Sequence, residues 1–379
     1  MGRYAAGDEV ARQILIGGGM TIKKIAILTG GGDCPGLNAA VRAIAKTCIH
    51  DYGWNVVGIL DGYEGLVTGH MREVSYDAVS NILFLGGTVL GTSNKANPFK
   101  FYEDGKEPAD LSDTAVKNLK KWDVDVLFCI GGDGTLSIAH RMLEKWPRII
   151  GVPKTIDNDL SATDQTFGFD SACAFATMAI DRIHSTAVSH HRAMVIEVMG
   201  RYAGWIALES GLAGGGDIIL IPEFPFNFDK IIEVIGSRSK AGKRASIVVV
   251  AEGAHPAGED YTVNGIVKDS PDPIRLGGIG KRVADHIEKH TGHESRVTVL
   301  GHLQRGGSPT FYDRVLATRY GHKAAALARE ENFGKMAALK GNEIVGVDIS
   351  EATSELKLVT ADNSLVAVAK SLGTSFGIC

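Results

Sequence analysis

The sequence predicts an α/β protein in which parallel sheets are covered by helices. Short β-branched runs recur along the chain, and several are followed by glycines and then by apolar residues at helical spacing. Such alternation is typical of parallel sheets whose ligands bind at the carboxyl ends of the strands. At 379 residues, the chain is long enough for two domains. Its 47 glycines gather in short sets, which indicates ligands held by backbone groups.

The first half of the chain carries four of these units. Ile25–Leu28 is the first expected strand, and apolar residues between Leu37 and Ala45 then have helical spacing. Three further strands are expected at Val56–Leu60, Val124–Ile130 and Ile149–Val152. Polar residues and glycines follow each strand, at the edge where a parallel sheet would place a ligand.

The second half carries another set of units, which predicts a second α/β domain. Its expected strands are Ala193–Val198, Ile218–Ile221, Ile247–Val250 and Val297–Leu300. Residues 254–273 are rich in proline, glycine and aspartate and are expected to form a surface excursion. Residues 1–19 precede the first strand and are expected to be an extension outside the fold.

Composition argues against several classes of protein. The 40 basic and 44 acidic side chains give a net charge of −4, which offers no basic surface for nucleic acid. No apolar run approaches the roughly 18 residues that span a bilayer, and the first residues lack the order of a signal peptide. The five cysteines are scattered and form no CxxC pair, which favours a reducing cytoplasm.

Two glycine loops follow expected strands and are candidate phosphate sites. Residues 30–36 lie before a helix amino end, where backbone N–H groups and the helix dipole favour an anion. This loop matches neither a Walker A motif nor GxGxxG, and a tight turn explains it equally well. In Gly131-Gly132-Asp133-Gly134-Thr135, the glycines allow a phosphate to approach closely and the carboxylate is free to hold Mg²⁺. A structural turn does not need both features, so the second loop favours phosphate or metal binding.

Paired carboxylates and several basic sets complete the candidate chemistry. Asp157-Asn158-Asp159 follows an expected strand, and two such carboxylates can divide metal binding from proton transfer. An Asx turn or a helix cap is the alternative explanation. Arginine matches phosphate oxygens bidentately, although solvated surface arginine is the usual alternative. The basic sets are His190-His191-Arg192, Gly200-Arg201-Tyr202, Arg296 and His302-Leu303-Gln304-Arg305.

These motifs, in this order, resemble the 6-phosphofructokinase family. The similarity extends from about Ile22 to at least Ala325 and depends on GGDCPGLNAAVR, DGYEGL, GGDGT, PKTIDND, EVMGRYAGW and LGHLQRGGSPTFYDR. The resemblance implies two Rossmann-like three-layer α/β/α domains with a catalytic cleft between them. Residues 20–168 with about 304–355 would form the nucleotide-binding domain, residues 169–303 the fructose 6-phosphate-binding domain, and residues 356–379 a tail.

The resemblance also implies a reaction and its participants. Family members transfer the γ-phosphoryl group of MgATP to the 1-hydroxyl of fructose 6-phosphate, giving fructose 1,6-bisphosphate in glycolysis. The implied cofactor is Mg²⁺, with ATP as co-substrate. The protein would then be a cytoplasmic homo-oligomer, a dimer or tetramer, whose active sites are shared between subunits.

The family's roles map onto residues of this sequence. Asp157 would be the base that deprotonates the 1-hydroxyl, Thr155 would contact the sugar near that group, and Arg201 would stabilise the moving phosphoryl group. Asp133 and Asp159 would bind Mg²⁺. The donor-binding residues would be Gly31, Tyr63, Lys95, Gly132, Gly134, Thr135 and Lys154. The remaining sugar-phosphate residues would be Met199, Gly200, Glu252, His302, Arg305 and, from a neighbouring subunit, Arg192 and Arg296.

The sequence evidence on the identity of the phosphoryl donor points in two directions. Family members that use pyrophosphate tend to carry aspartate at the position of Gly134, where a carboxylate would repel an α-phosphate. They also tend to carry lysine at the position of Lys154, as this chain does. We expect the space at Gly134 to decide in favour of ATP, with the pyrophosphate-dependent phosphotransferase as the alternative. Another acceptor, such as sedoheptulose 7-phosphate, stays open. A non-catalytic sugar-phosphate sensor is disfavoured, because it would be expected to lose the metal or base carboxylates.

Overall fold

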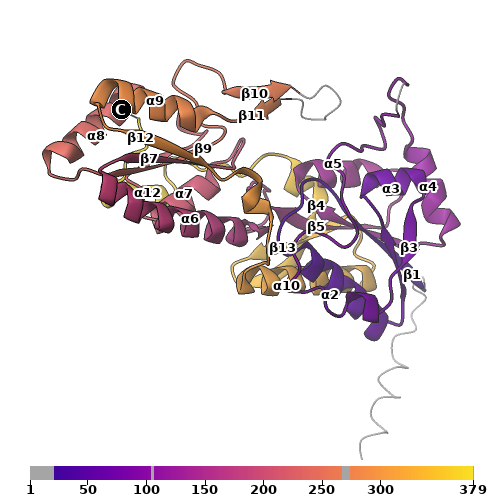
Figure 1. Ribbon diagram of the computed structural model, residues 1–379. Coiled ribbons are helices and arrows are strands. Elements are labelled where there is room, and N and C mark those ends of the chain that lie inside the picture. Colours follow the sequence, from indigo (N-terminus) through magenta and orange to yellow (C-terminus); the bar gives the residue numbers. More distant parts are fainter. Residues whose placement is uncertain (1–20, 104–105, 267–273, 379) are drawn as a thin grey trace, which may run out of the picture.

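The computed structural model describes residues 21–103, 106–266 and 274–378, and it contains two sheets of mostly parallel strands in two lobes (Figure 1). The first sheet has the order β14-β13-β5-β4-β1-β2-β3, with β6 paired to β5. Only β3 and β14, at its two edges, run antiparallel to their neighbours. Its strands are β1 (Lys24–Thr29), β2 (Asn55–Ile59), β3 (Met71–Glu73), β4 (Val126–Gly131), β5 (Ile149–Thr155), β6 (Phe167–Gly168), β13 (Lys335–Lys340) and β14 (Glu343–Asp348).

Helices cover both faces of the first sheet. Alternate residues of its central strands contribute to opposite layers, as the pleat requires: Ile27 and Phe128 belong to one core cluster, and Leu28 and Cys129 to the other. The first cluster includes residues of α2 (Leu37–His50) and α10 (Phe311–Arg329). The second includes residues of α3 (Tyr63–Thr68), α4 (Ser112–Lys121), α5 (Asp133–Met142) and α11 (Ile349–Thr353).

The second sheet is wholly parallel and has the order β12-β7-β9-β8. Its strands are β7 (Ala193–Val198), β8 (Ile218–Leu220), β9 (Ser246–Ala251) and β12 (Ser295–Val299). Its core clusters place α6 (Phe169–His190) and α7 (Trp205–Ala213) on one face, and α8 (Phe228–Lys240) and α9 (Ile279–Thr291) on the other. The remaining elements are the hairpin of β10 (Val263–Ile266) and β11 (Ile274–Leu276), the 3₁₀ helices η1 (Asp77–Val79) and η2 (Gly301–Arg305), and α12 (Ser364–Ser371).

The strand order of the first sheet explains where a ligand can enter. After β1 the chain builds β2 and β3 on one side, and then crosses to build β4 and β5 on the other. The helices after β1 and β4 consequently cover opposite faces, so the loops that lead into them begin side by side at the carboxyl edge and run toward opposite faces of the sheet. These loops are the two glycine loops, residues 30–36 and 131–135.

The α/β class predicted from the sequence is confirmed. The first sheet takes its strands from residues 24–168 and 335–348, and the second from residues 193–299. We retain the domain boundaries given above as a proposal. Residues 1–19, expected to be an extension, lie outside the described residues. None of the helices in the described part of the chain is both long and apolar enough to cross a membrane.

Candidate active site

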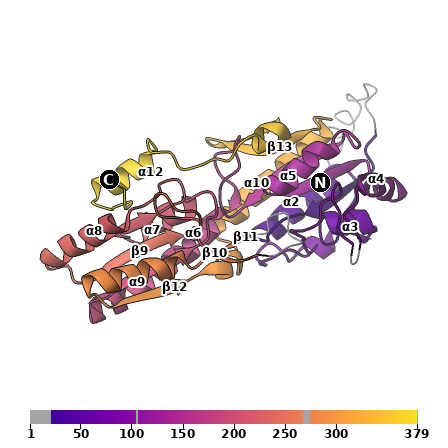
Figure 2. The same cartoon turned by 90° about the horizontal axis from the view of Figure 1, so that it is seen from above.

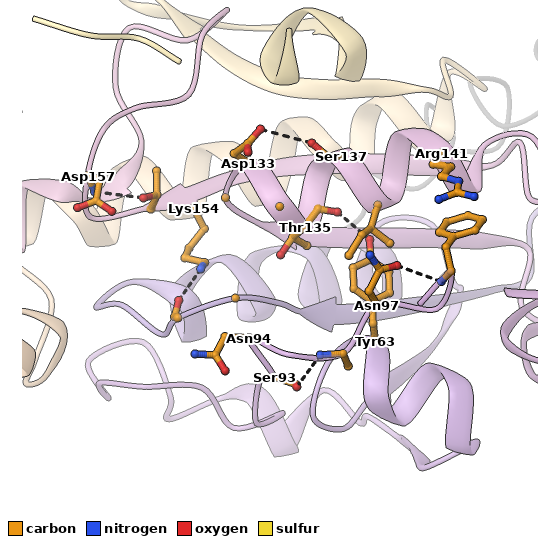
Figure 3. A pocket seen from close by; sticks show the side chains of 18 of the residues that line it. Tyr63, Ser93, Asn94, Asn97, Asp133, Thr135, Ser137, Arg141, Lys154 and Asp157 are labelled. Carbon is orange, nitrogen blue, oxygen red and sulfur yellow. Dashed lines mark hydrogen bonds between the residues drawn. The ribbon is translucent and has the colours of Figure 1, made fainter. Parts of the chain in front are cut away.

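A cavity of about 630 Å³ opens at the carboxyl edge of the first sheet (Figure 3). This volume is typical of a site for a small organic ligand. Many of the residues predicted for the site line it: Gly31, Tyr63, Gly132, Asp133, Gly134, Thr135, Lys154, Thr155, Asp157 and Arg305. Residues that lie far apart in the sequence therefore meet where the strand order predicts a ligand.

The two glycine loops pack against each other around Thr135. A Cβ atom on Gly30 would lie 2.6 Å from Thr135 Oγ1, and one on Gly131 would overlap with the same side chain. The buried Tyr63 hydroxyl donates to the carbonyl oxygen of Thr135 at 2.8 Å. Glycine is required at both positions because any larger residue would displace Thr135. Without side chains there, the backbone N–H groups of the loops stay accessible from the cavity.

Two cations lie where these loops meet β5 and the second lobe. The ammonium group of buried Lys154 donates to the carbonyl oxygen of Gly32 at 2.5 Å, and burial lowers the pKa of Lys154. Arg305, in the segment after β12, donates from Nη1 to the carbonyl oxygen of Asp33 at 3.1 Å. A Cβ atom on Gly32 would lie 2.6 Å from the same Nη1 atom. The absence of a side chain at residue 32 thus allows the second lobe to reach the first glycine loop.

Three carboxylates influence one another beside these cations. Asp133 begins α5, and Asp157 and Asp159 follow β5. Burial raises the pKa of Asp157, while Arg305 and Lys154 oppose this effect. Burial, followed by the charges of Asp157 and Asp133, raises the pKa of Asp159 to about 7. Oδ1 of Asp157 is buried without a hydrogen-bond partner among the described residues. Such a cluster favours a bound proton or cation.

The carboxylates fit a magnesium ion that arrives with phosphate. Within the described ranges, no three His, Cys, Asp or Glu side chains lie close enough to hold a metal ion by themselves. Mg²⁺ commonly uses only one or two carboxylates, and water and substrate phosphates complete its coordination. Burial raises the pKa of Asp133, and the Ser137 hydroxyl donates to its Oδ1 at 3.4 Å. Asp133 and Asp159 therefore suit an ion whose coordination is shared with a phosphate ligand, rather than an ion that the protein holds by itself.

The second lobe brings Glu252 and the segment Met199–Arg201 to the carboxyl ends of β9 and β7. Burial, and next the charge of Asp157, raises the pKa of Glu252 to about 7, whereas Arg305 lowers it. The N–H of Met199 donates to Oε1 of Gln304 at 3.4 Å. The carboxyl edges of the two sheets thus face each other around Asp157 and Arg305.

Arg192 and Arg296 lie at the other edge of the second sheet. Arg192 precedes β7 and donates to both carboxylate oxygens of Glu294, at 2.8 and 3.0 Å. Arg296, near the start of β12, also binds Glu294. A strand of six residues spans about 20 Å. The structure therefore does not bring these arginines to Asp157 of the same chain.

Like Arg192 and Arg296, the second-lobe residues Met199, Gly200, Arg201 and Glu252 do not line the cavity, and three further predicted residues also lie outside its lining. Lys95 is exposed, although its neighbours Asn94 and Ala96 both line the cavity. His302 is exposed on η2, three residues before Arg305. Asp159 is partly buried, two residues after Asp157 in the same turn. No helix begins within residues 156–166, so the helix-cap explanation of this carboxylate cluster is wrong.

Sequence reasoning missed part of the cavity wall. The guanidinium carbon of Arg141 lies 3.9 Å from the centre of the Phe99 ring, and Asn97 lies beside this pair (Figure 3). Helical spacing was the available signal for Arg141. Ser137 and Arg141 follow Asp133 at steps of four residues, which places all three on one face of α5.

Comparisons with known proteins agree with this geometry. The family model for phosphofructokinase matches residues 24–328. This chain belongs to the phosphofructokinase family. It is 53% identical over 360 residues to the ATP-dependent 6-phosphofructokinase 2 of Clostridium perfringens, covering 94% of this chain and 98% of that one. It is 51% identical over 339 residues to the pyrophosphate–fructose 6-phosphate 1-phosphotransferase of Amycolatopsis mediterranei, covering 89% of this chain and 97% of that one.

Solved structures of the family share the fold. The phosphofructokinase from Saccharomyces cerevisiae matches with a TM-score of 0.75 and 34% identity, over 88% of this chain. The match covers 45% of that chain, so the present protein spans less than half of the yeast chain's length. The pyrophosphate-dependent phosphofructokinase from Marinobacter aquaeolei matches with a TM-score of 0.78 at 22% identity, over 93% of this chain and 88% of that one, which supports the fold alone. The family predicted from the motifs is confirmed.

Proposed function

We propose that this protein is an ATP-dependent 6-phosphofructokinase, which transfers the γ-phosphoryl group of MgATP to the 1-hydroxyl of fructose 6-phosphate. One observation carries the proposal. The cavity joins Asp157, Lys154, Arg305 and the two glycine loops to a wall that contains Phe99. A base, cations and backbone donors for phosphate are the parts that phosphoryl transfer requires.

The cavity wall favours a nucleotide over pyrophosphate as the donor. Ala96, Phe99 and Ile138 add apolar surface to the lining besides the glycine loops. A nucleobase would cover this surface, whereas pyrophosphate would leave it to water. At Gly134, which lines the cavity, an added Cβ atom would meet nothing within 4 Å. That space supports a donor that extends beyond its second phosphate.

In this proposal, Asp157 removes the proton of the 1-hydroxyl. Its buried Oδ1 has no partner in the described part of the chain, and burial raises the pKa of Asp157, which Arg305 and Lys154 oppose by favouring its ionised form. The hydroxyl oxygen attacks the γ-phosphorus as the bond to the β–γ bridging oxygen breaks, and ADP leaves. Lys154, Arg305 and Arg201 would offset the charge on the moving group. The Asp157 N–H donates to Oγ1 of Thr155 at 3.1 Å, which holds the base in place.

The same proposal assigns the remaining residues. Asp133 and Asp159 would hold Mg²⁺, which offsets phosphate charge when bound with the nucleotide. Met199, Gly200 and Glu252 would hold the sugar, since Glu252 shares the electrostatic environment of Asp157 and Arg305. The 6-phosphate would bind Arg305 and His302 together with two arginines of a neighbouring subunit.

We propose a cytoplasmic homo-oligomer, a dimer or tetramer, with shared active sites. Arg192 and Arg296 lie at the far edge of the second sheet, too far from Asp157 to serve the site of their own chain. Glu294 binds both arginines and keeps their guanidinium groups side by side, an arrangement suited to phosphate oxygens. The cysteines of the described residues are free, which agrees with a reducing compartment.

Pyrophosphate is the alternative donor, because Lys154 lines the cavity and a pyrophosphate-dependent relative is 51% identical. Initial rates with fructose 6-phosphate and Mg²⁺, measured with each donor, decide between the two. Turnover with ATP and a rate at least about 100-fold lower with pyrophosphate is the expected result. Turnover with pyrophosphate alone would show that Lys154 sets the donor, and turnover with neither would contradict the proposed reaction.

A further inference from the structure

The C-terminal segment, residues 354–378, returns from the first lobe to the second (Figure 2). On its way it contacts the turn that carries Asp157 and Asp159. Leu356 forms an isolated bridge with Leu160, next to Asp159. Further on, α12 packs on α7, and the N–H of Asn227 donates to the carbonyl oxygen of Gly377 at 2.8 Å. The segment is therefore attached to both lobes, and residues 357–359 lie between these two attachments.

Lys357 is the residue of this segment that binds the catalytic turn. Its ammonium group donates to Oδ1 of Asn158 at 3.0 Å, to the carbonyl oxygen of Thr163 at 3.1 Å and to that of Asp164 at 2.9 Å. These three acceptors match the three N–H donors of an ammonium group. Its own backbone N–H donates to the carbonyl oxygen of Asp159 at 2.8 Å.

Asn158 shows why this support is needed. Its φ of +51° lies in the left-handed region, which carries a conformational cost for a residue other than glycine. Buried Asn158 separates Asp157 from Asp159, so its backbone conformation sets the directions of both carboxylates. Its Oδ1 accepts from the N–H of Thr166 at 3.0 Å as well as from Lys357. Without the ammonium group, the three acceptors of this turn would lose a shared, charged donor.

The other side of residue 357 faces the second lobe. The indole Nε1 of Trp205, the first residue of α7, donates to the carbonyl oxygen of Lys357 at 2.7 Å. Glu223 accepts from the N–H of Val359 at 2.9 Å and from that of Gly204 at 3.0 Å. Gly204 and Trp205 follow Arg201 closely in the chain. Residue 357 thus joins the turn of Asp157 to the segment that carries Arg201.

We propose that Lys357 is a positioning residue for phosphoryl transfer: it holds the Asp157–Asp159 turn in its conformation and fixes that turn relative to the second lobe. This inference rests on the proposed function. Lys357 does not line the cavity and contacts neither substrate in the proposal. Its removal should therefore lower kcat while leaving the KM of both substrates almost unchanged.

Lys357→Met tests this role, because methionine keeps the apolar stem and removes the ammonium group. We expect kcat to fall by about 10- to 100-fold, the loss that a small misplacement of reacting groups produces. Both KM values should change by less than about threefold. Lys370→Met is the matched control, since Lys370 is an exposed lysine of the same segment, on α12. It should retain the wild-type kcat.

Asn158→Gly tests the route of the effect. Glycine adopts a φ of +51° without strain, so this variant removes the Oδ1 acceptor and keeps the backbone. We expect kcat to fall at least as much as in Lys357→Met. The double variant should show a loss smaller than the product of the two single losses, because both substitutions remove the contact between Lys357 and Asn158. If Lys357→Met fails to fold, Asn158→Gly alone decides: a fall in kcat supports the inference, and a wild-type kcat overturns it.

Hydrogen exchange of the peptide covering residues 157–166 supplies a readout that needs no turnover. We expect its amides to exchange at least about tenfold faster in Lys357→Met than in the wild type or in Lys370→Met. Wild-type kcat in Lys357→Met overturns the inference, and so does a fall in kcat with unchanged exchange. If the wild type turns over neither donor, the proposed function fails. Faster exchange would then still support Lys357 as the residue that holds the turn, and unchanged exchange would overturn it.

Discussion

Replacing Gly134 by aspartate would place a carboxylate where the proposed nucleotide extends past its second phosphate. The structure predicts a small effect on folding, because an added Cβ atom would meet nothing within 4 Å. Residue 134 is the second residue of α5, where an acidic side chain stabilises the helix by about 0.3–1 kcal/mol. The variant should therefore fold with a stability within about 1 kcal/mol of the wild type, and its kinetics should report the donor site.

The expected loss follows from charge repulsion. Two unit charges separated by about 5 Å at an effective dielectric of about 20 repel by about 3 kcal/mol. That energy corresponds to about two powers of ten in kcat/KM for ATP. Gly134→Asn is the matched control, because asparagine has nearly the same volume without the charge. We expect Gly134→Asn to lose clearly less ATP activity than Gly134→Asp.

The assay is the initial rate with ATP and with pyrophosphate at saturating fructose 6-phosphate, together with a thermal melt of each variant. For Gly134→Asp we expect kcat/KM for ATP to fall by about 100-fold. The rate with pyrophosphate should stay within about threefold of the wild-type rate with pyrophosphate. If Gly134→Asp kept kcat/KM for ATP within threefold of the wild type, the α-phosphate would not lie near residue 134, and our reasoning on the donor would be refuted.

Three further predictions concern the base, the subunits and pH. Asp157→Ser should lower kcat by about 10²- to 10⁴-fold while fructose 6-phosphate still binds with nearly unchanged affinity by calorimetry; a wild-type kcat would rule out Asp157 as the base. Inactive Asp157→Ser and Arg192→Ser enzymes, mixed so that their subunits exchange, should regain activity, because a hybrid oligomer contains an intact shared site. A mixture of Asp157→Ser and Arg201→Ser should stay inactive, because both residues come from the same chain. Equal behaviour of the two mixtures would exclude shared sites. Burial, and next the charge of Asp170, raises the pKa of Glu209 to about 7. Because the pKa of this carboxyl is higher in the folded state, the wild type loses stability as pH rises from about 4.5 through about 7. Glu209→Gln should therefore gain about 3 kcal/mol in free energy of unfolding over the wild type at pH 8 relative to pH 4, measured by denaturant unfolding. The same difference in unfolding free energy between Glu209→Gln and the wild type at both pH values would contradict the raised pKa of Glu209.

The sequence alone determined the local parts of this protein. Each glycine loop, each core strand and the turn of Asp157 depends on residues close together in the chain, because backbone conformation and side-chain periodicity are local properties. Gly131, Asp133 and Thr135 are an example. Their order predicted a phosphate loop, and in the structure they line or pack beside the cavity at the end of β4. The family followed from the same motifs taken in series.

The tertiary structure alone decided which of these parts meet. Arg305 packs on Gly32 and contributes to the cavity, whereas Arg192, equally suited to phosphate by its chemistry, lies at the opposite edge of its sheet. Lys357 gave no signal in the sequence, yet it binds the turn beside the proposed base. The physical reason is that such contacts depend on how sheets and helices pack, and packing is set by many weak interactions between segments that are distant in the chain.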